Sequence, residues 1–204
     1  QGDSGSDTYL FGPGGGGDTI YDYFSGDTGV DTLEFTGGID RADVDFLVEG
    51  NNLRVQVRGT SDSVLIQNWF ISSGYRLNQF KFSDGTTLTA AQLEAESYKV
   101  LGTTGNDSLT GSAYKDALYG NAGNDTLNGV GGDDVLYGED GADALVGGIG
   151  NDTFSGGAGN DYLQGDSGSD TYLFGPGGGG DTIYDYFSGD TGVDTLEFTG
   201  GIDR

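Results

Sequence analysis

Three residue types are missing from this chain: its 204 residues include no cysteine, no histidine and no methionine. Without cysteine the chain can form no disulfide, no thiolate nucleophile and no cysteine-ligated zinc site. The absence of histidine removes the most common general base and the most common ligand of transition metals. Oxygen atoms remain as ligands, and these are the ligands that hard cations such as Ca²⁺ prefer.

Basic residues are scarce, with 8 lysines and arginines against 33 acidic residues and a formal net charge of −25. A surface this acidic repels nucleic-acid phosphates and anionic membranes, so we expect neither as a partner. No apolar run approaches the ~20 residues that span a bilayer, so we expect no membrane insertion of this segment. Hydrophobic residues make up only 34% of the chain, and a cation that neutralises clustered carboxylates would help to stabilise its fold.

The sequence repeats itself over a long period. Residues 1–41 recur without a change as residues 164–204, which gives a repeat of 163 residues. This pattern is typical of one unit of a tandem array followed by the beginning of the next, and an artificial duplication is the alternative. The first copy lacks preceding repeats in this chain, so we expect residues 1–17 to be poorly ordered or completed by a second molecule in a head-to-tail contact.

A shorter repeat fills residues 102–173, which divide into eight consecutive nonapeptides. Position 1 of each is glycine, and position 6 is aspartate: Asp107, Asp116, Asp125, Asp134, Asp143, Asp152, Asp161 and Asp170. Position 8 is a large apolar residue: Leu109, Leu118, Leu127, Leu136, Leu145, Phe154, Leu163 and Tyr172. Twelve acidic residues and one lysine give these repeats a net charge of −11, so their carboxylates repel one another unless cations bind.

These nonapeptides resemble the GGxGxDxUx calcium-binding repeat of RTX proteins. The resemblance implies an all-β fold, a parallel β-roll in which two nonapeptides make one coil and position 8 points inward. Loops 18 residues apart then stack along the same edge, and each Ca²⁺ lies between stacked loops, held by aspartates and backbone carbonyls. Four loops on each edge leave three gaps, which implies about six ions in the main roll.

The glycine-rich turns supply the expected backbone ligands. Glycine at positions 1, 2 and 4 permits backbone geometry that is closed to residues with a Cβ. The expected backbone ligands are Gly120, Gly123, Gly129, Gly132, Gly138, Gly141, Gly147, Gly150, Gly156, Gly159 and Gly165. One loop departs from the pattern, because Tyr114 replaces glycine and Lys115 follows it. The first site on that edge is therefore in doubt, and a simple cap of the roll is the alternative.

The repeats become irregular after residue 173. Asp181 and Asp194 keep the Asp-x-apolar spacing after longer loops, as do their counterparts Asp18 and Asp31 in the first copy. We expect Asp181 to be a further calcium ligand. The expected organisation is a truncated roll end over 1–41, a β-rich domain over 42–100, the calcium-binding roll over 101–173, and degenerate closing turns with the start of the next unit over 174–204.

Residues 42–100 differ in character. Alternating apolar residues over 44–49 and 53–58, joined by a turn at 50–52, predict a β-hairpin. Further strands are expected over 63–70, over 76–82 and around Leu88. Thr89 and Gln92 form a capping box, which predicts a short helix over 90–97. The stretch resembles the β-rich domain interleaved with RTX repeats in haemolysin-type calcium-binding proteins.

Two groups of side chains in this region have alternative interpretations. Trp69, Phe70 and Tyr75 either stack on sugars or fill a small core, and we favour the core. Five basic residues either bind an anionic polymer, or they form surface pairs or meet the acidic roll of a neighbour, and we favour the second interpretation: Arg41, Arg54, Arg58, Arg76 and Lys81. Acidic pairs can mimic a glycosidase site, but the aspartates are assigned to calcium, so we expect no enzyme.

The resemblance implies a calcium-binding structural module of a large secreted or cell-surface RTX protein, adhesin-like, which folds on binding calcium after type I export from a Gram-negative cell. The 163-residue repetition favours this function. One alternative is the non-catalytic appendage of a secreted enzyme such as a lipase, protease or epimerase. Another is a carbohydrate-binding module over 42–100. The expected partners are calcium ions and neighbouring copies of the repeat.

Overall fold

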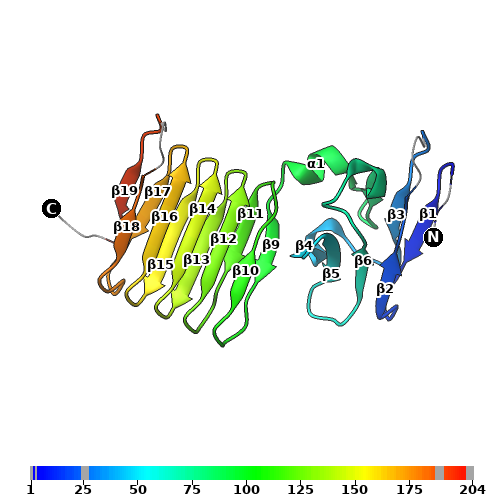
Figure 1. The fold of residues 1–204 in the computed structure, drawn as a ribbon. Coiled ribbons are helices and arrows are strands. Elements are labelled where there is room, and N and C mark those ends of the chain that lie inside the picture. The colour runs from blue at the N-terminus through cyan, green and yellow to red at the C-terminus, as the bar shows by residue number, and fades with distance from the viewer. Residues whose placement is uncertain (1, 3, 24–27, 187–190, 201–204) are drawn as a thin grey trace. The chain divides into compact units, whose positions relative to one another are not determined.

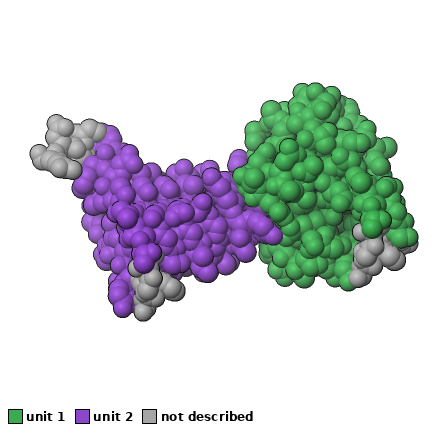
Figure 2. All heavy atoms as spheres, turned by 90° about the horizontal axis from the view of Figure 1, so that it is seen from above, with its two compact units in different colours: residues 1–96 green, residues 97–204 purple. Residues whose placement is uncertain are grey.

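The computed structural model describes residue 2 and residues 4–23, 28–186 and 191–200. The chain divides into two compact units, residues 1–96 (unit 1) and residues 97–204 (unit 2), which Figure 2 shows in different colours. Two of the expected boundaries differ from this division. Tyr98–Leu101 (β9) pairs in parallel with a strand of the roll, and residues 1–41 share a unit with residues 42–96, which we call the β-domain. Parts of the expected closing turns, 187–190 and 201–204, lie outside the described residues.

Unit 2 is a parallel β-roll, as the nonapeptides predicted (Figure 1). One of its sheets has the strand order β10-β12-β14-β16-β18, and in the other the order is β9-β11-β13-β15-β17-β19. In the regular part each residue pairs with the residue 18 positions later, for example Leu127 with Leu145. The strands are β9, β10 (Ser108–Thr110), β11 (Asp116–Tyr119), β12 (Thr126–Gly131), β13 (Val135–Asp140), β14 (Ala144–Ile149), β15 (Thr153–Ala158), β16 (Tyr162–Ser167), β17 (Thr171–Phe174), β18 (Thr182–Tyr184) and β19 (Thr195–Phe198).

The position-8 side chains form the core of the roll. Seven of the eight are at most 2% exposed, and Leu109, on the terminal strand β10, is half-buried. The rings of Phe154 and Tyr172 stack with their centroids 5.1 Å apart. Strands β12 to β16 each contain six residues. Each of these strands continues from position 7 of one nonapeptide through position 3 of the next.

Unit 1 also contains two sheets, with strand orders β1-β3-β7-β8 and β2-β6-β5-β4. The predicted hairpin is present as antiparallel β4 and β5, and the predicted capping box at Thr89 begins α1. The helix and strands β6 and β7 are shorter than expected, and β6 ends before Asn68, whose positive φ of 59° turns the chain. The elements are β1 (Thr8–Phe11), β2 (Gly17–Ile20), β3 (Thr32–Phe35), β4 (Val44–Glu49), β5 (Asn52–Val57), β6 (Ser63–Ile66), β7 (Gln79–Lys81), β8 (Thr87–Thr89), α1 (Ala90–Glu94) and two 3₁₀ turns, Arg41–Asp43 and Ser73–Tyr75.

The first 41-residue copy packs onto the β-domain. Strand β2 pairs in parallel with β6, and β3 pairs in parallel with β7. Ile20, Leu33 and Phe35 are at most 5% exposed in the resulting core. The structure differs from the expectation of poor order over the described residues 4–17, because β1 pairs with β3 and the Phe11 ring meets the Phe35 ring edge-on at 6.0 Å. Residues 1 and 3 of that expectation lie outside the described residues.

Candidate metal centre

A ladder of hydrogen bonds links the position-6 aspartates along each edge of the roll. The backbone N–H of each aspartate donates to Oδ1 of the next aspartate on the same edge, over 2.7–3.1 Å. Edge A carries Asp107, Asp125, Asp143, Asp161 and Asp181, and edge B carries Asp116, Asp134, Asp152, Asp170 and Asp194. All nine aspartates expected from the sequence therefore belong to one of these two ladders, and Asp194 is a further member on edge B.

The other oxygen of these carboxylates has a different environment. In six of them one oxygen is buried and accepts no hydrogen bond: Asp116 Oδ1 and the Oδ2 atoms of Asp125, Asp134, Asp143, Asp152 and Asp161. Leaving a buried acceptor unsatisfied costs about 1–3 kcal/mol, and more when it is charged. A cation bound between the loops would remove this cost, so the loops fit the group that the nonapeptides imply.

Burial raises the pKa of several aspartates of the two ladders. The pKa rises to about 8 at Asp134, to about 7 at Asp152, and to about 6 at Asp143 and at Asp116. Loss of solvent is the largest cause, and carboxylates stacked on the same edge add to it at Asp134, where Asp116 and Asp152 lie on either side. Without a cation, the folded roll therefore holds protons that the unfolded chain releases at neutral pH.

Glycine at position 1 leaves room for a cradle of oxygens. A Cβ at Gly120 would lie 2.5 Å from Oδ2 of Asp125 and 2.7 Å from the carbonyl oxygen of Gly138 in the next loop of edge A. A Cβ at Gly129 would collide with Oδ2 of Asp134 in the same way. Oxygens of two successive loops thus converge at a point that any side chain would fill.

Glycine at position 4 allows the loops to stack closely. Gly123 and Gly141 have positive φ angles of 130° and 152°, which L side chains rarely adopt. A Cβ at Gly123 would lie 2.7 Å from the carbonyl oxygen of Gly105, and one at Gly141 would overlap the carbonyl of Gly123. Residues at position 2 also have positive φ angles, and not all of them are glycine, because Val130 has a φ of 81°. Position 2 therefore accommodates residues other than glycine in this geometry.

The first loop of each edge donates hydrogen bonds to Oδ2 of its own aspartate. The N–H and hydroxyl of Thr103 donate to Oδ2 of Asp107, at 2.6 and 2.9 Å, and Ser112 does the same for Asp116. Tyr114 is not among the residues with positive φ, because no earlier loop on its edge forces that geometry. This arrangement is consistent with a cap at the beginning of the roll, and the expected departure at Tyr114 is accommodated by an altered turn.

A second ladder, at position 5, was missed by the sequence reasoning. The Oδ1 atom of Asn106 accepts the N–H of Asn124 at 2.9 Å, and Oδ1 of Asn124 accepts the N–H of Ala142 at 3.0 Å. On edge B, Oδ1 of Asp133 accepts the N–H of Asn151, and Oδ1 of Asn151 accepts the N–H of Ser169. The recurring Asn-Asp pair in the nonapeptides was the signal that could have revealed it.

The closing turns continue both edges. Asp181 Oδ1 accepts the N–H of Asp161 at 3.1 Å across a longer loop, and Asp194 Oδ1 accepts that of Asp170 at 3.0 Å. Oxygens of Asp170, Asp185 and Asp194 all lie within 4.8 Å of one another. The irregular end of the roll therefore keeps the acidic geometry of the regular part.

Comparison with known families identifies this geometry. Residues 101–136 and 137–172 match the RTX calcium-binding nonapeptide repeat, in four copies, and residues 52–92 match the haemolysin-type calcium binding protein related domain. The chain belongs to the RTX haemolysin-type calcium-binding proteins. Both resemblances, the nonapeptide and the interleaved β-rich domain, are confirmed.

Two known proteins are similar to parts of this chain or align with it. The iron-regulated protein FrpA of Neisseria meningitidis serogroup C is 40% identical over 90 residues, which are 43% of this RTX chain and 8% of that protein. The extracellular lipase LipA from Serratia marcescens aligns with all of this chain and 34% of its own at 20% identity, with a TM-score of 0.33. The chain thus spans only a small part of either protein, and a TM-score this low establishes no structural kinship.

The structure places Trp69 and four of the arginines for which the sequence left two interpretations. Trp69 has no exposed surface and packs beside Phe80 at 5.8 Å, so it belongs to the core and offers no platform for sugars. Four arginines form ion pairs: Arg41 with Glu96, Arg54 with Glu49, Arg58 with Asp45 and Arg76 with Glu94. Within the described part of the chain, no helix is long and apolar enough to cross a membrane.

Proposed function

We propose that this chain is a structural repeat module of a large secreted or cell-surface RTX protein, adhesin-like in role, that folds on binding calcium after export. The observation that carries the proposal is the set of six buried carboxylate oxygens without a hydrogen-bond donor. Calcium suits them because it accepts a flexible shell of about six to eight oxygen ligands, whereas magnesium demands near-ideal octahedral geometry. The 163-residue repetition supports an array rather than a single appendage.

Bound calcium would supply the positive charge that stacked carboxylates require. The proposed ligands are the carboxylates of the two edges, Asp181 included, and the carbonyls of the position-1 and position-4 glycines. Three gaps between the regular loops of each edge correspond to about six ions. The buried aspartates whose pKa is raised would release their protons when calcium binds, so folding and metal binding would be coupled.

Export and folding are then linked through calcium concentration. RTX proteins typically leave Gram-negative cells by type I secretion, and the roll would stay unfolded where calcium is scarce. Sites of the extracellular kind bind calcium at about 10⁻⁴–10⁻³ M, so folding would follow release from the cell. We assign the chain no catalytic role, because its buried aspartates are used by the ladders and the ions.

Far-ultraviolet circular dichroism of the full chain in EDTA and in millimolar calcium tests this proposal. We expect calcium to produce β-structure in unit 2 and magnesium to substitute poorly. Trp69, the single tryptophan, lies in unit 1, so its fluorescence emission serves as an internal control for the β-domain. A β-sheet spectrum that EDTA leaves unchanged would contradict the proposal.

A further inference from the structure

The two identical 41-residue copies lie in different surroundings. Leu33 is 1% exposed, whereas its counterpart Leu196 is 48% exposed. Phe35 and Phe198 show the same contrast, at 2% and 50%, and Ile20 is 5% exposed while its counterpart is 39% exposed. Because the two sequences are the same, the difference comes entirely from their neighbours. The second copy therefore presents an apolar face that the first copy buries.

In the first copy the cover is the β-domain. Its strands β6 and β7 pair with β2 and β3, with Ile66 opposite Ile20 and Phe80 opposite Leu33. In the second copy the counterparts of β2 and β3 are β18 and β19, each the terminal strand of its sheet among the described residues. Terminal strands present unpaired backbone groups, which are a template for pairing with a further strand.

Polar contacts at this junction are specific. The carboxylate of Asp62 accepts the backbone N–H groups of Gly14 and Gly16, at 2.7 and 2.9 Å. Oδ1 of Asn78 accepts the N–H of Asp31 at 2.6 Å, so this asparagine takes the place of the next aspartate in the ladder. Glu34 is paired in register with Lys81, which places opposite charges side by side.

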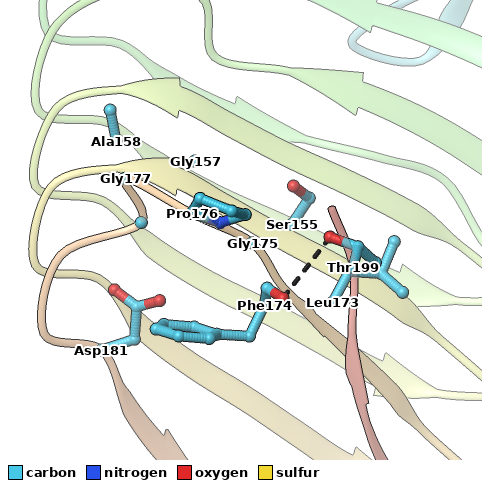
Figure 3. A pocket seen from close by; sticks show the side chains of 11 residues that line it. Ser155, Gly157, Ala158, Leu173, Phe174, Gly175, Pro176, Gly177, Asp181 and Thr199 are labelled. Atoms are coloured by element: carbon cyan, nitrogen blue, oxygen red, sulfur yellow. Dashed lines mark hydrogen bonds between the residues drawn. The ribbon is translucent and has the colours of Figure 1, made fainter. Parts of the chain in front are cut away.

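The second copy carries the counterparts of all these groups. Gly177 and Gly179 correspond to Gly14 and Gly16, Asp194 to Asp31, and Glu197 to Glu34. The loop that holds Gly177 borders a hollow of about 250 Å³ beside Phe174, Asp181 and Thr199 (Figure 3). The side of the second copy that faces the preceding repeats is buried, since Tyr172 is 2% exposed. One side of the segment thus packs on the roll and the other is open.

We propose that this open face, formed by β18, β19 and the loop 175–179, binds the β-domain of a further copy of the repeat. The occupant is a second copy because the same residues already bind that domain in unit 1, with strand pairing and three polar contacts. The 41-residue segment is then a two-sided joint, and the aspartate ladder of one repeat ends on Asn78 of the next. The second copy is a partner that the proposed function does not name. The contact rests on that function because it requires a folded roll, but it does not depend on the number of bound ions.

Single-cysteine variants test the inference, since the chain has no cysteine of its own. One protein is the full chain, and the other is extended after Arg204 by residues 42–96, which reproduces the natural join between Arg41 and Ala42. Thiol labelling of Leu196→Cys in saturating calcium should slow by about tenfold or more in the extended protein, because buried cysteines are inert. Asn78→Ala together with Asp62→Ala, made only in the added copy, should restore fast labelling.

Two matched positions serve as controls. Leu33→Cys should label slowly in both proteins, and Ile149→Cys, at a site on the roll that is 71% exposed, should label rapidly in both. Equal, fast labelling of Leu196→Cys in both proteins, with calcium-induced β-structure intact, would overturn the inference and leave the proposed function standing. A roll that fails to fold in calcium would overturn both.

Discussion

Asp134→Asn separates the two roles of an aspartate in the middle of the roll. Asp134 is 1% exposed, and its Oδ1 accepts the N–H of Asp116 at 2.7 Å. Its Oδ2 is buried and accepts no hydrogen bond. Asparagine keeps an oxygen for the ladder but loses the charge and the second oxygen. The variant therefore removes a calcium ligand while the ladder stays in place.

The expected loss follows from the stacking. At ~10 mM calcium and a Kd of about 10⁻⁴–10⁻³ M, each ion stabilises the folded roll by about 1.4–2.7 kcal/mol. Asp134 lies between two loops on its edge, so the substitution should weaken two ions and cost about 3–5 kcal/mol in calcium.

Asp107→Asn is the matched control. Asp107 has a neighbour on one side of its edge only, and Thr103 already donates two hydrogen bonds to its Oδ2. We expect its cost in calcium to be less than half that of Asp134→Asn. The pair therefore compares a mid-roll ligand with a terminal one.

Urea unfolding followed by circular dichroism measures both effects. The emission of Trp69, which is fully buried in unit 1, should show an unchanged transition for the β-domain in both variants. Equal losses for Asp134→Asn and Asp107→Asn in calcium would refute the stacked-loop reasoning.

Three further predictions concern the loops. Gly141→Ala should lower the free energy of unfolding in urea by about 3 kcal/mol, because the new Cβ would overlap the carbonyl of Gly123. Gly105→Ala is the control and should be nearly neutral, because the nearest atom to its Cβ would be 3.8 Å away. Val130→Gly should stabilise the roll by about 1 kcal/mol, because it relieves a β-branched residue held at positive φ. In EDTA, the β-structure of unit 2 measured by circular dichroism should decrease as the pH rises from about 4 to about 8, since the folded roll binds more protons than the unfolded chain over that range. In calcium the trend should reverse, with urea midpoints falling as the pH drops below about 6, because protons compete with the ion for the same oxygens. A circular dichroism signal of unit 2 that is independent of pH in EDTA would contradict this prediction.

The repeat could be interpreted from the sequence because its contacts obey a local rule. The RTX resemblance implies two nonapeptides per coil, so the nine-residue period sets each loop against the loop 18 residues later and places Asp125 beside Asp143 and Leu127 beside Leu145. The hairpin and the capping box at Thr89 depend on neighbouring residues in the same way. Such features follow from backbone geometry and side-chain alternation, and they need no knowledge of distant contacts.

Amino-acid sequence by itself determined the roll, its two acidic edges and its affinity for oxygen-ligated cations, because these features recur at a fixed short period. Tertiary structure alone decided which side chains are buried elsewhere. Trp69 belongs to the core because Phe80 and Arg76 pack against it, and Asn78 ends a ladder that begins far away in the sequence. Leu33 and Leu196 have identical sequence surroundings, yet one is buried and the other half exposed. Burial depends on what packs against a residue, and for these two copies only the three-dimensional arrangement supplies a different neighbour.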